Sequence, residues 1–145
     1  MTATIKRADT LESLQRCLPL LQELRPAYAG RETDMLAQIA LQQQEGFELY
    51  YVEQGTQIAA CAGIRFLQLL AHEGKILYVD DLITDESLRS KGYGKLLMDY
   101  LVDYAKKQAC TAITLDSSVQ RFRTHRFYLR EQFDIMGHHF VQELH

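Results

Sequence analysis

The sequence predicts an α/β (α+β) fold with a mixed central sheet of about six to seven strands flanked by about four helices, in the order β-α-α-β-β-β-α-β-α-β. Three observations predict it. Leucines at helical spacing fill the first third of the chain, strand-like runs fill the middle, and a long apolar helix stripe separates the later strands. The 145 residues, 47% apolar and 24% charged, suit one domain, assigned to residues 1–145.

The chain is expected to begin with a short strand and a helix. Residues 2–6 form the strand. Asp9 or Thr10 can cap the helix, because short polar side chains accept hydrogen bonds from its first N–H groups. Pro19 lies within the leucine pattern that follows, and we expect it to kink or split the helix near Leu18.

A second helix and a group of strands are expected next. Residues 25–30 form a break, and the helix runs from about residue 32 to 44. Gly46 follows, at a position where helices commonly end on glycine. The periodicity then changes to that of strands, which are expected at 47–53, 57–67 and 75–84.

The clearest helix of the chain comes after the third of these strands. Its apolar residues fall on one continuous stripe, and they are Tyr93, Leu96, Leu97, Tyr100, Leu101, Tyr104 and Ala105. Residues 111–116 are a β-branched strand, 121–131 a helix and 133–141 a last strand. The strand–helix–strand passage predicts one βαβ unit beside an otherwise antiparallel sheet.

Composition excludes several classes of function. The 16 basic and 19 acidic residues give a net charge of −3, which disfavours a general nucleic-acid binder. No apolar run approaches the ~18 residues that span a bilayer, so no membrane partner is expected. Cys17, Cys61 and Cys110 form no CxxC pair, which favours buried thiols in a reducing cytoplasm. His138 and His139 are strand neighbours that face apart, so no metal site is expected.

A glycine-containing turn precedes the clearest helix. Gly92 and Gly94 are separated by one residue, and Arg89, Lys91 and Lys95 surround them with positive charge. N–H groups at a helix N-terminus, together with the helix dipole, attract phosphate. Glycines before a helix also mark ordinary turns, so the motif taken alone leaves two interpretations open, a phosphate-binding loop and a plain turn.

Two nucleotide-binding motifs fit this turn poorly. A Walker A loop continues Gly-Lys with serine or threonine, whereas Gly94-Lys95 is followed by Leu96. A dinucleotide fingerprint needs a third small residue where Leu97 stands.

The turn resembles the acyl-CoA pyrophosphate loop of the GNAT superfamily of acetyl-CoA-dependent N-acetyltransferases. Arg89-x-x-Gly92-x-Gly94 carries the resemblance, and the run from His125 to Phe133 is similar to the closing signature of that family. The order of elements is also that of the family, so the resemblance covers essentially the whole chain.

The sequence departs from the family pattern at three positions. Ser90 stands where many members have a third glycine, Arg121 stands where asparagine is common, and Gln132 replaces the glycine before Phe133. The change at Arg121 puts in doubt one side-chain contact to the pantetheine arm of the cofactor. The change at Gln132 suggests a different turn after the last helix.

The resemblance implies acetyl-CoA as co-substrate, without a metal. The residues implied to bind it are Leu82, Ile83, Thr84, Arg89, Ser90, Lys91, Gly92, Tyr93, Gly94 and Lys95. An N–H near Leu82 would meet the carbonyl oxygen of the acetyl group, and Tyr128 would protonate the leaving sulfur.

The adjacent acids Asp80 and Asp81 are the candidate route for the proton of the acceptor amine. Some small-amine acetyltransferases similarly carry an acidic pair nine residues before the loop arginine, as Asp80 precedes Arg89. Strand neighbours face apart unless a bulge intervenes. We therefore expect Asp80 to act through water, and Asp81 to face the other side. The alternative is an acid pair that only binds a nearby arginine or solvent.

The acceptor is expected to meet residues of the break between the first helices. Arg25 and Tyr28 are candidate substrate contacts, together with Asp81. Arg25 would favour an acceptor with a carboxylate or phosphate, whereas Glu23 would favour a cation. The sequence leaves this choice open.

The predicted function is direct transfer of acetyl from acetyl-CoA to a primary amine, preferably of a small molecule, in a ternary complex. An acyl-CoA-binding sensor without catalysis and a protein N-acetyltransferase are the alternatives. The basic residues at 121–130 are interpreted as contacts to the cofactor 3′-phosphate or as solvated charge, not as a nucleic-acid site. A homodimer is compatible with the family.

Overall fold

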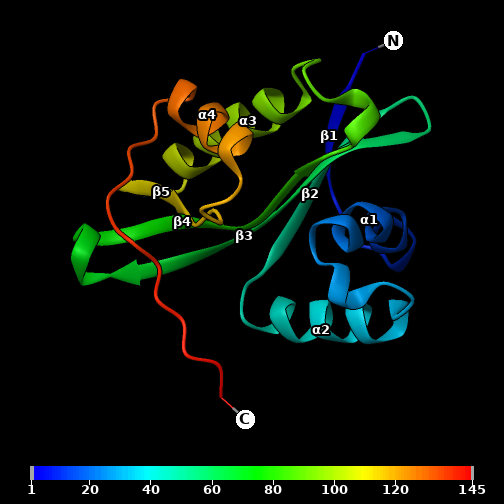
Figure 1. Ribbon diagram of the computed structural model, residues 1–145, viewed down its shortest axis with the longest axis horizontal. Coiled ribbons are helices and arrows are strands. Elements are labelled where there is room, and N and C mark those ends of the chain that lie inside the picture. The colour runs from blue at the N-terminus through cyan, green and yellow to red at the C-terminus, as the bar shows by residue number, and fades with distance from the viewer. Residues whose placement is uncertain (1, 145) are drawn as a thin grey trace. The chain divides into compact units, whose positions relative to one another are not determined.

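A computed structural model describes residues 2–144 of the chain. They form two compact units, one that ends at Thr114 and one that begins at Leu115. The sheet has the strand order β1-β2-β3-β4-β5, with antiparallel pairing from β1 through β4 (Figure 1). The strands are β1 (Thr4–Arg7), β2 (Glu48–Gln54), β3 (Gln57–Leu69), β4 (Gly74–Thr84) and β5 (Ala112–Leu115).

The predicted α/β fold class is confirmed, with four α-helices in the expected order. They are α1 (Leu11–Leu24), α2 (Glu32–Gln44), α3 (Tyr93–Lys107) and α4 (Phe122–Arg130). Three short 3-10 turns connect elements, namely η1 (Pro26–Tyr28), η2 (Leu70–His72) and η3 (Glu86–Leu88). Helix α3 connects β4 to its neighbour β5, as the predicted βαβ unit requires.

Helix α1 begins at a cap that the sequence predicted. The Thr10 side chain accepts from the Ser13 N–H at 3.1 Å, and Ser13 Oγ accepts from the Thr10 N–H at 3.1 Å. The expectation that Pro19 kinks or splits the helix is wrong, since one helix runs through it. Leu18 and Leu21, buried on either side of the proline, hold both halves against the sheet and outweigh the lost hydrogen bond.

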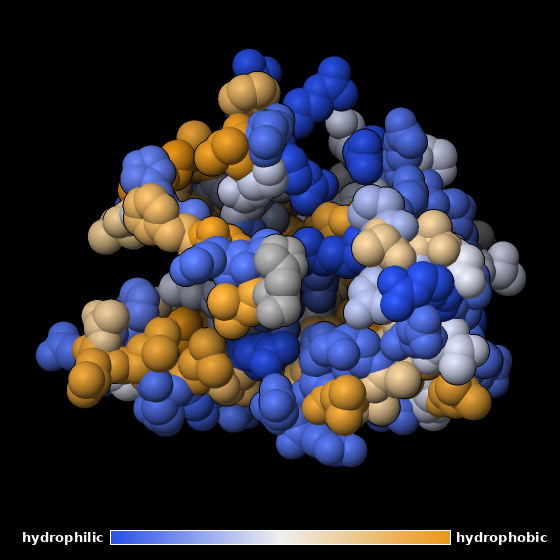
Figure 2. Space-filling view, turned by 60° about the horizontal axis from the view of Figure 1, so that its bottom comes forward, coloured by the Kyte–Doolittle hydropathy of each residue, from blue (hydrophilic) through white to orange (hydrophobic). Residues whose placement is uncertain are grey.

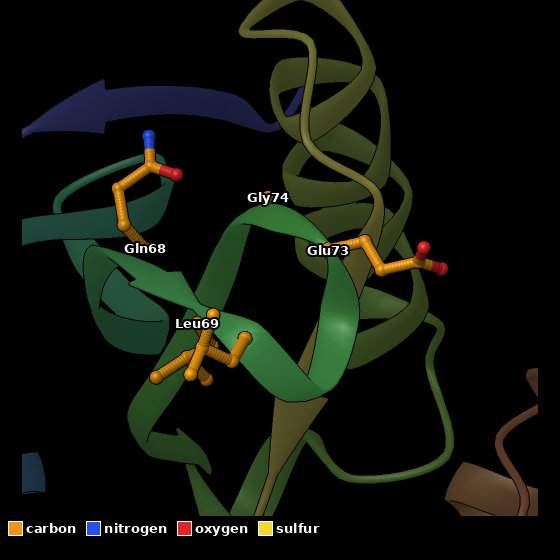
Figure 3. A pocket seen from close by; sticks show the side chains of 5 residues that line it. Gln68, Leu69, Glu73 and Gly74 are labelled. Atoms are coloured by element: carbon orange, nitrogen blue, oxygen red, sulfur yellow. The ribbon is translucent and has the colours of Figure 1, made fainter.

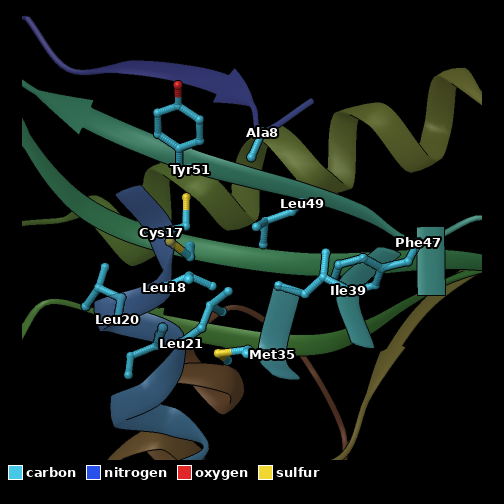
Figure 4. Packing of buried hydrophobic residues seen from close by; sticks show 12 residues of the cluster. Ala8, Cys17, Leu18, Leu20, Leu21, Met35, Ile39, Phe47, Leu49 and Tyr51 are labelled. Atoms are coloured by element: carbon cyan, nitrogen blue, oxygen red, sulfur yellow. The ribbon is translucent and has the colours of Figure 1, made fainter. Parts of the chain in front are cut away.

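The main core lies between α1, α2 and one face of the sheet (Figure 4). Its buried side chains include Leu21, Met35, Ile39 and Phe47. Cys17 and Cys61 are fully buried free thiols in this core. Because α1 and α2 both pack here, the segment that joins them begins near the end of β4, where Arg25 bonds to Asp81.

Helix α3 packs on β2, β3 and β4. Part of its predicted apolar stripe is buried, whereas Leu96 and Tyr100 remain 40% and 38% exposed. Leu97, Met98 and Leu101 are nearly inaccessible. At its rim, the hydroxyl of Tyr104 donates to Glu48 Oε1 at 2.9 Å. This packing fixes the start of α3, and with it the glycine-containing turn that leads into the helix.

The strand predicted at residues 133–141 is absent from the structure. The segment has no regular structure, and Met136 and Phe140 are 91% and 90% exposed. The sheet accordingly has five strands and not the six to seven expected. An apolar alternating run forms a strand only where a neighbouring strand accepts its hydrogen bonds, and the local sequence does not indicate whether such a strand is present.

Within residues 2–144, no helix has the length and apolar character needed to cross a membrane.

Candidate active site

The adjacent acids Asp80 and Asp81 lie at an irregularity of the sheet. Gly63 pairs with Asp81, and the next pair along the ladder is Ile64 with Val79. Asp80 is therefore an extra residue without a partner across the ladder, which is a β-bulge. A bulge bends the strand and interrupts the alternation of side chains between its two faces.

Both carboxylates point to the face of the sheet that α1 and α2 cover. Arg65 donates from Nε to Asp80 Oδ2 at 2.8 Å, and its Nη2 lies 2.7 Å from the same oxygen. Arg65 lies over the ring of Phe47, a core residue of that face. Asp81 lies beside Gly63, where a Cβ would overlap the same ring. The expectation that Asp81 faces the other side is therefore wrong, because the bulge intervenes.

Arg25, the residue that caps the C-terminus of α1, joins the two acids. Its Nε donates to Asp81 Oδ1 at 2.8 Å, and its Nη2 lies 2.6 Å from that oxygen. Nη2 also donates to the backbone oxygen of Asp80 at 3.0 Å. Three residues predicted from the sequence, Asp80, Asp81 and Arg25, are thus brought together. We call them, with Arg65, the bulge cluster.

The environment of Asp80 favours a carboxyl that can exchange a proton. Burial raises the pKa of Asp80, and the hydrogen bond and charge of Arg65 offset part of that effect. Both bonds to Arg65 end on Oδ2, so Oδ1 takes no part in them. Oδ1 is the atom that can accept a proton while Oδ2 stays held.

Tyr28 is the last residue of η1, the 3-10 turn that directly follows Arg25. Its N–H donates to the Arg25 carbonyl at 3.0 Å, which helps to fix the backbone of that residue. The ring packs partly against the main core, with the Arg31 guanidinium 5.4 Å from its centroid. Tyr28 therefore supports the segment that carries Arg25.

Sequence reasoning missed Arg65 and Gly63. Both lie on β3 at the same face as the buried Cys61. A charged residue at an inward strand position needs an opposite charge, which is the signal that could have identified Arg65 as a partner of one of the two acids. Gly63 carries no such signal, because its role depends on the ring of Phe47, the residue directly before β2.

The second half of β4 continues past the end of β5. The Thr111 N–H donates to the Lys75 carbonyl at 2.8 Å, so β5 starts beside the first residues of β4. With four residues against the 11 of β4, it is too short to reach Leu82. The backbone edge of Leu82–Thr84 therefore lies beyond β5, directly after the bulge cluster.

The glycine-containing turn has a left-handed backbone at two positions. Gly92 is the N-cap of α3 with φ +86°, a left-handed conformation that suits glycine, and a Cβ there would meet nothing within 4 Å. Ser90 is left-handed as well, with φ +66°. N–H groups of the first helical turn lack acceptors within the helix, so they are available to an anion.

Tyr128 belongs to the second unit, on α4. Its ring packs against Phe127 and Phe133, with centroids 5.5 and 5.7 Å apart. Burial raises the pKa of Tyr128, and the charge of Arg121 opposes this. Gln132, at the turn after the helix, has φ +70°, a left-handed conformation that favours glycine.

A separate hollow of about 400 Å³ lies at the turn between β3 and β4 (Figure 3). It is lined by Gln68, Leu69, Leu70, Glu73 and Gly74. Apolar side chains gather over this end of the hairpin, at the left of the view in Figure 2. The extended strand places the hollow about 20 Å from Asp80, at ~3.3 Å per residue, so it is not part of the bulge cluster.

Among residues 2–144, no group of three His, Cys, Asp or Glu side chains is arranged to hold a metal ion.

Comparison with known proteins gives consistent matches. The model of the acetyltransferase (GNAT) family matches residues 9–133. The uncharacterized N-acetyltransferase YhdJ of Bacillus subtilis is 35% identical over 124 residues, 86% of each chain. Glucosamine 6-phosphate N-acetyltransferase of Arabidopsis thaliana is 30% identical over 69 residues, 47% of this chain and 46% of that protein. An aminoglycoside acetyltransferase from an uncultured soil metagenomic sample shares the fold, with a TM-score of 0.79 at 16% identity over 99% of this chain and 97% of the other.

Proposed function

The chain belongs to the acetyltransferase (GNAT) family of acyltransferases, and on that premise we propose that it transfers acetyl from acetyl-CoA directly to a primary amine of a small molecule, in a ternary complex. One observation carries the proposal. The bulge cluster and the backbone edge of Leu82–Thr84 adjoin along β4, and the glycine-containing turn follows. An acceptor amine and a thioester arm would therefore meet on one strand.

The loop and the strand edge fit acetyl-CoA, which supplies the activated thioester. Arg89, Lys91 and Lys95 offer positive charge around the left-handed Gly92, where the pyrophosphate would lie. The backbone of Leu82, Ile83 and Thr84 would bind the pantetheine arm as an added strand. An N–H at Leu82 would then stabilise the negative charge that develops on the carbonyl oxygen.

The bulge cluster would deprotonate the acceptor. An alkyl ammonium has a pKa of about 10.4, so it must lose a proton before it attacks. Asp80 Oδ1 would take this proton through a water molecule, while Arg65 holds Oδ2. Because burial raises the pKa of Asp80, its affinity for the proton is higher than that of an exposed carboxylate.

Tyr128 would donate its phenolic proton to the departing thiolate. The raised pKa of its phenol keeps the hydroxyl protonated at neutral pH, although it also makes the phenol a weaker acid. Transfer to a thiolate, whose conjugate thiol has a pKa of about 8.5, is then uphill and requires proton movement concerted with bond cleavage.

Ligand-dependent melting tests the cofactor first. A ligand at ~100 times its Kd adds about 2.7 kcal/mol and shifts Tm by several degrees for a domain of this size. We expect shifts with acetyl-CoA and CoA, and none with ATP or NAD. A folded protein that responds to neither CoA species would overturn the proposal.

Two substitutions then test the chemistry by thiol release. Asp80→Asn and Tyr128→Phe should each lower kcat by about a hundredfold or more, the usual contribution of a general acid or base, with the shift by acetyl-CoA retained. Asp103→Asn and Tyr100→Phe are matched controls, because these residues lie on α3 outside the cluster. Wild-type thiol release in the Asp80→Asn and Tyr128→Phe variants would overturn the roles of these two residues. A wild-type protein that binds acetyl-CoA but releases no thiol with any amine would be a sensor and not this enzyme.

A further inference from the structure

The bulge cluster is balanced in charge. Asp80 and Asp81 oppose Arg25 and Arg65, and each acid is already bonded to an arginine. Glu45 approaches only the outer side of Arg65, at 3.8 Å, and is three-quarters exposed. A site built to attract a polycation would leave its carboxylates unpaired, so this balance disfavours an acceptor with several positive charges.

The two arginines differ in how much of the side chain remains available to a ligand. The Arg65 side chain is 22% exposed and serves Asp80, whereas the Arg25 side chain is 52% exposed. The side-chain bonds of Arg25 to the two acids use Nε and Nη2, and among residues 2–144 no hydrogen bond or ion pair uses its Nη1. These bonds hold the guanidinium plane, so the N–H groups of Nη1 keep a fixed direction without side-chain ordering at the moment of binding.

We propose that the acceptor amine also carries an anionic group, a carboxylate or a phosphate, and that Arg25 binds this group through Nη1. The inference rests on the function proposed above. The ammonium of such an acceptor lies toward Asp80, and its anion lies toward Arg25, whose Nη2 is bonded to the Asp80 backbone. Charge-assisted pairs between arginine and carboxylate or phosphate are among the stronger polar contacts, so the anion adds both affinity and orientation.

Other acceptor classes match the cluster less well. A neutral alkyl amine satisfies Asp80 but offers nothing to Nη1. The second ammonium of a diamine lies near the positive charge of Arg25, and the Asp81 carboxylate is already engaged by that arginine. The bound anion also places the amine, which matters because rate depends on the orientation of the attacking nitrogen.

An amine panel of similar length tests the inference. The acceptors are n-butylamine, γ-aminobutyrate, aminopropyl phosphate and putrescine, which differ in the group at the far end of the chain. We expect kcat/KM to be about tenfold or more higher for the two anionic acceptors than for n-butylamine, the effect of one charge-assisted contact. Putrescine should be no better than n-butylamine.

The outcomes separate this inference from the proposed function. Acetylation that favours n-butylamine or putrescine overturns the inference and leaves the acetyltransferase intact. No acetylation of any amine, with no shift of Tm by acetyl-CoA, overturns the proposed function and the inference with it. Preference for one anionic acceptor over the other distinguishes a carboxylate from a phosphate.

Variants of Arg25 assign the preference to that residue. Arg25→Gln should reduce the ratio of kcat/KM for γ-aminobutyrate over n-butylamine by about tenfold, and should improve putrescine because Asp81 is released. Arg25→Lys should keep part of the preference. Arg16→Gln is the matched control, because this arginine bonds to Glu53 and the Thr56 carbonyl, outside the bulge cluster. A folded Arg25→Gln protein with the wild-type ratio would overturn the assignment.

Discussion

Gly63→Ala is the substitution that the geometry of the site predicts most sharply. A Cβ at this position would lie 2.5 Å from both Cε1 and Cζ of Phe47, and 3.2 Å from Asp81 Oδ2. Carbon atoms in contact normally lie ~3.5–4.0 Å apart. The new methyl group therefore overlaps the ring by about 1 Å or more on this scale.

The ring has little freedom to move away. Phe47 is 3% exposed, in a core with Leu21, Met35 and Ile39. Overpacking of a core typically costs 1–3 kcal/mol, and we expect a loss of about 2 kcal/mol in the free energy of unfolding. For a chain of this length the loss corresponds to a decrease in Tm of roughly 4 to 8 °C. A displaced ring also presses on Arg65, so acetyl transfer should fall together with stability.

Urea denaturation followed by circular dichroism measures this loss, with the slope m as a check that the unfolded state is unchanged. Phe47→Leu is the matched background, because it removes the ring that the methyl group meets. In that background Gly63→Ala should cost less than half as much. A Gly63→Ala protein as stable as wild type, or an equal cost in both backgrounds, would refute the reasoning.

Three further predictions concern other parts of the chain. Gly92→Ala meets no neighbouring atom but must adopt φ +86°, so it should cost about 1 kcal/mol in urea denaturation and weaken acetyl-CoA binding in titration calorimetry. Tyr128→Phe should lose thiol release without losing acetyl-CoA affinity; equal losses of both would contradict a proton-transfer role. Hydrogen bonds from Lys6 and Arg16 hold the pKa of Glu53 below its usual value. The stability that this carboxylate contributes is therefore present above its unfolded pKa of ~4.3 and lost as pH falls, and Glu53→Gln should flatten the acid side of a Tm–pH curve.

Local signals in the sequence were sufficient for most of the helices. Helix α2 spans Glu32–Gln44 as predicted, with Gly46 left-handed after it, and α3 begins at Tyr93 where its stripe begins. These features depend on residues close together in sequence. Pro19 was misjudged because its cost is outweighed by burial of α1 against the sheet, and the strand expected at 133–141 required a partner strand that the local pattern does not specify.

The candidate site combines predictable residues with an arrangement that the sequence does not encode locally. Asp80, Asp81 and Arg25 were identifiable as charged residues near the turn and the helix break. Strand alternation would place the two acids on opposite faces, and only the bulge opposite Gly63 and Ile64 brings both to the face that carries Arg25 and Arg65. A bulge is a mismatch of register between two strands, so it depends on β3 as much as on β4. The register mismatch brings both acids to the two arginines and so balances the charge of the bulge cluster. The expected acceptor class depends on this balance and not on the acidic pair alone.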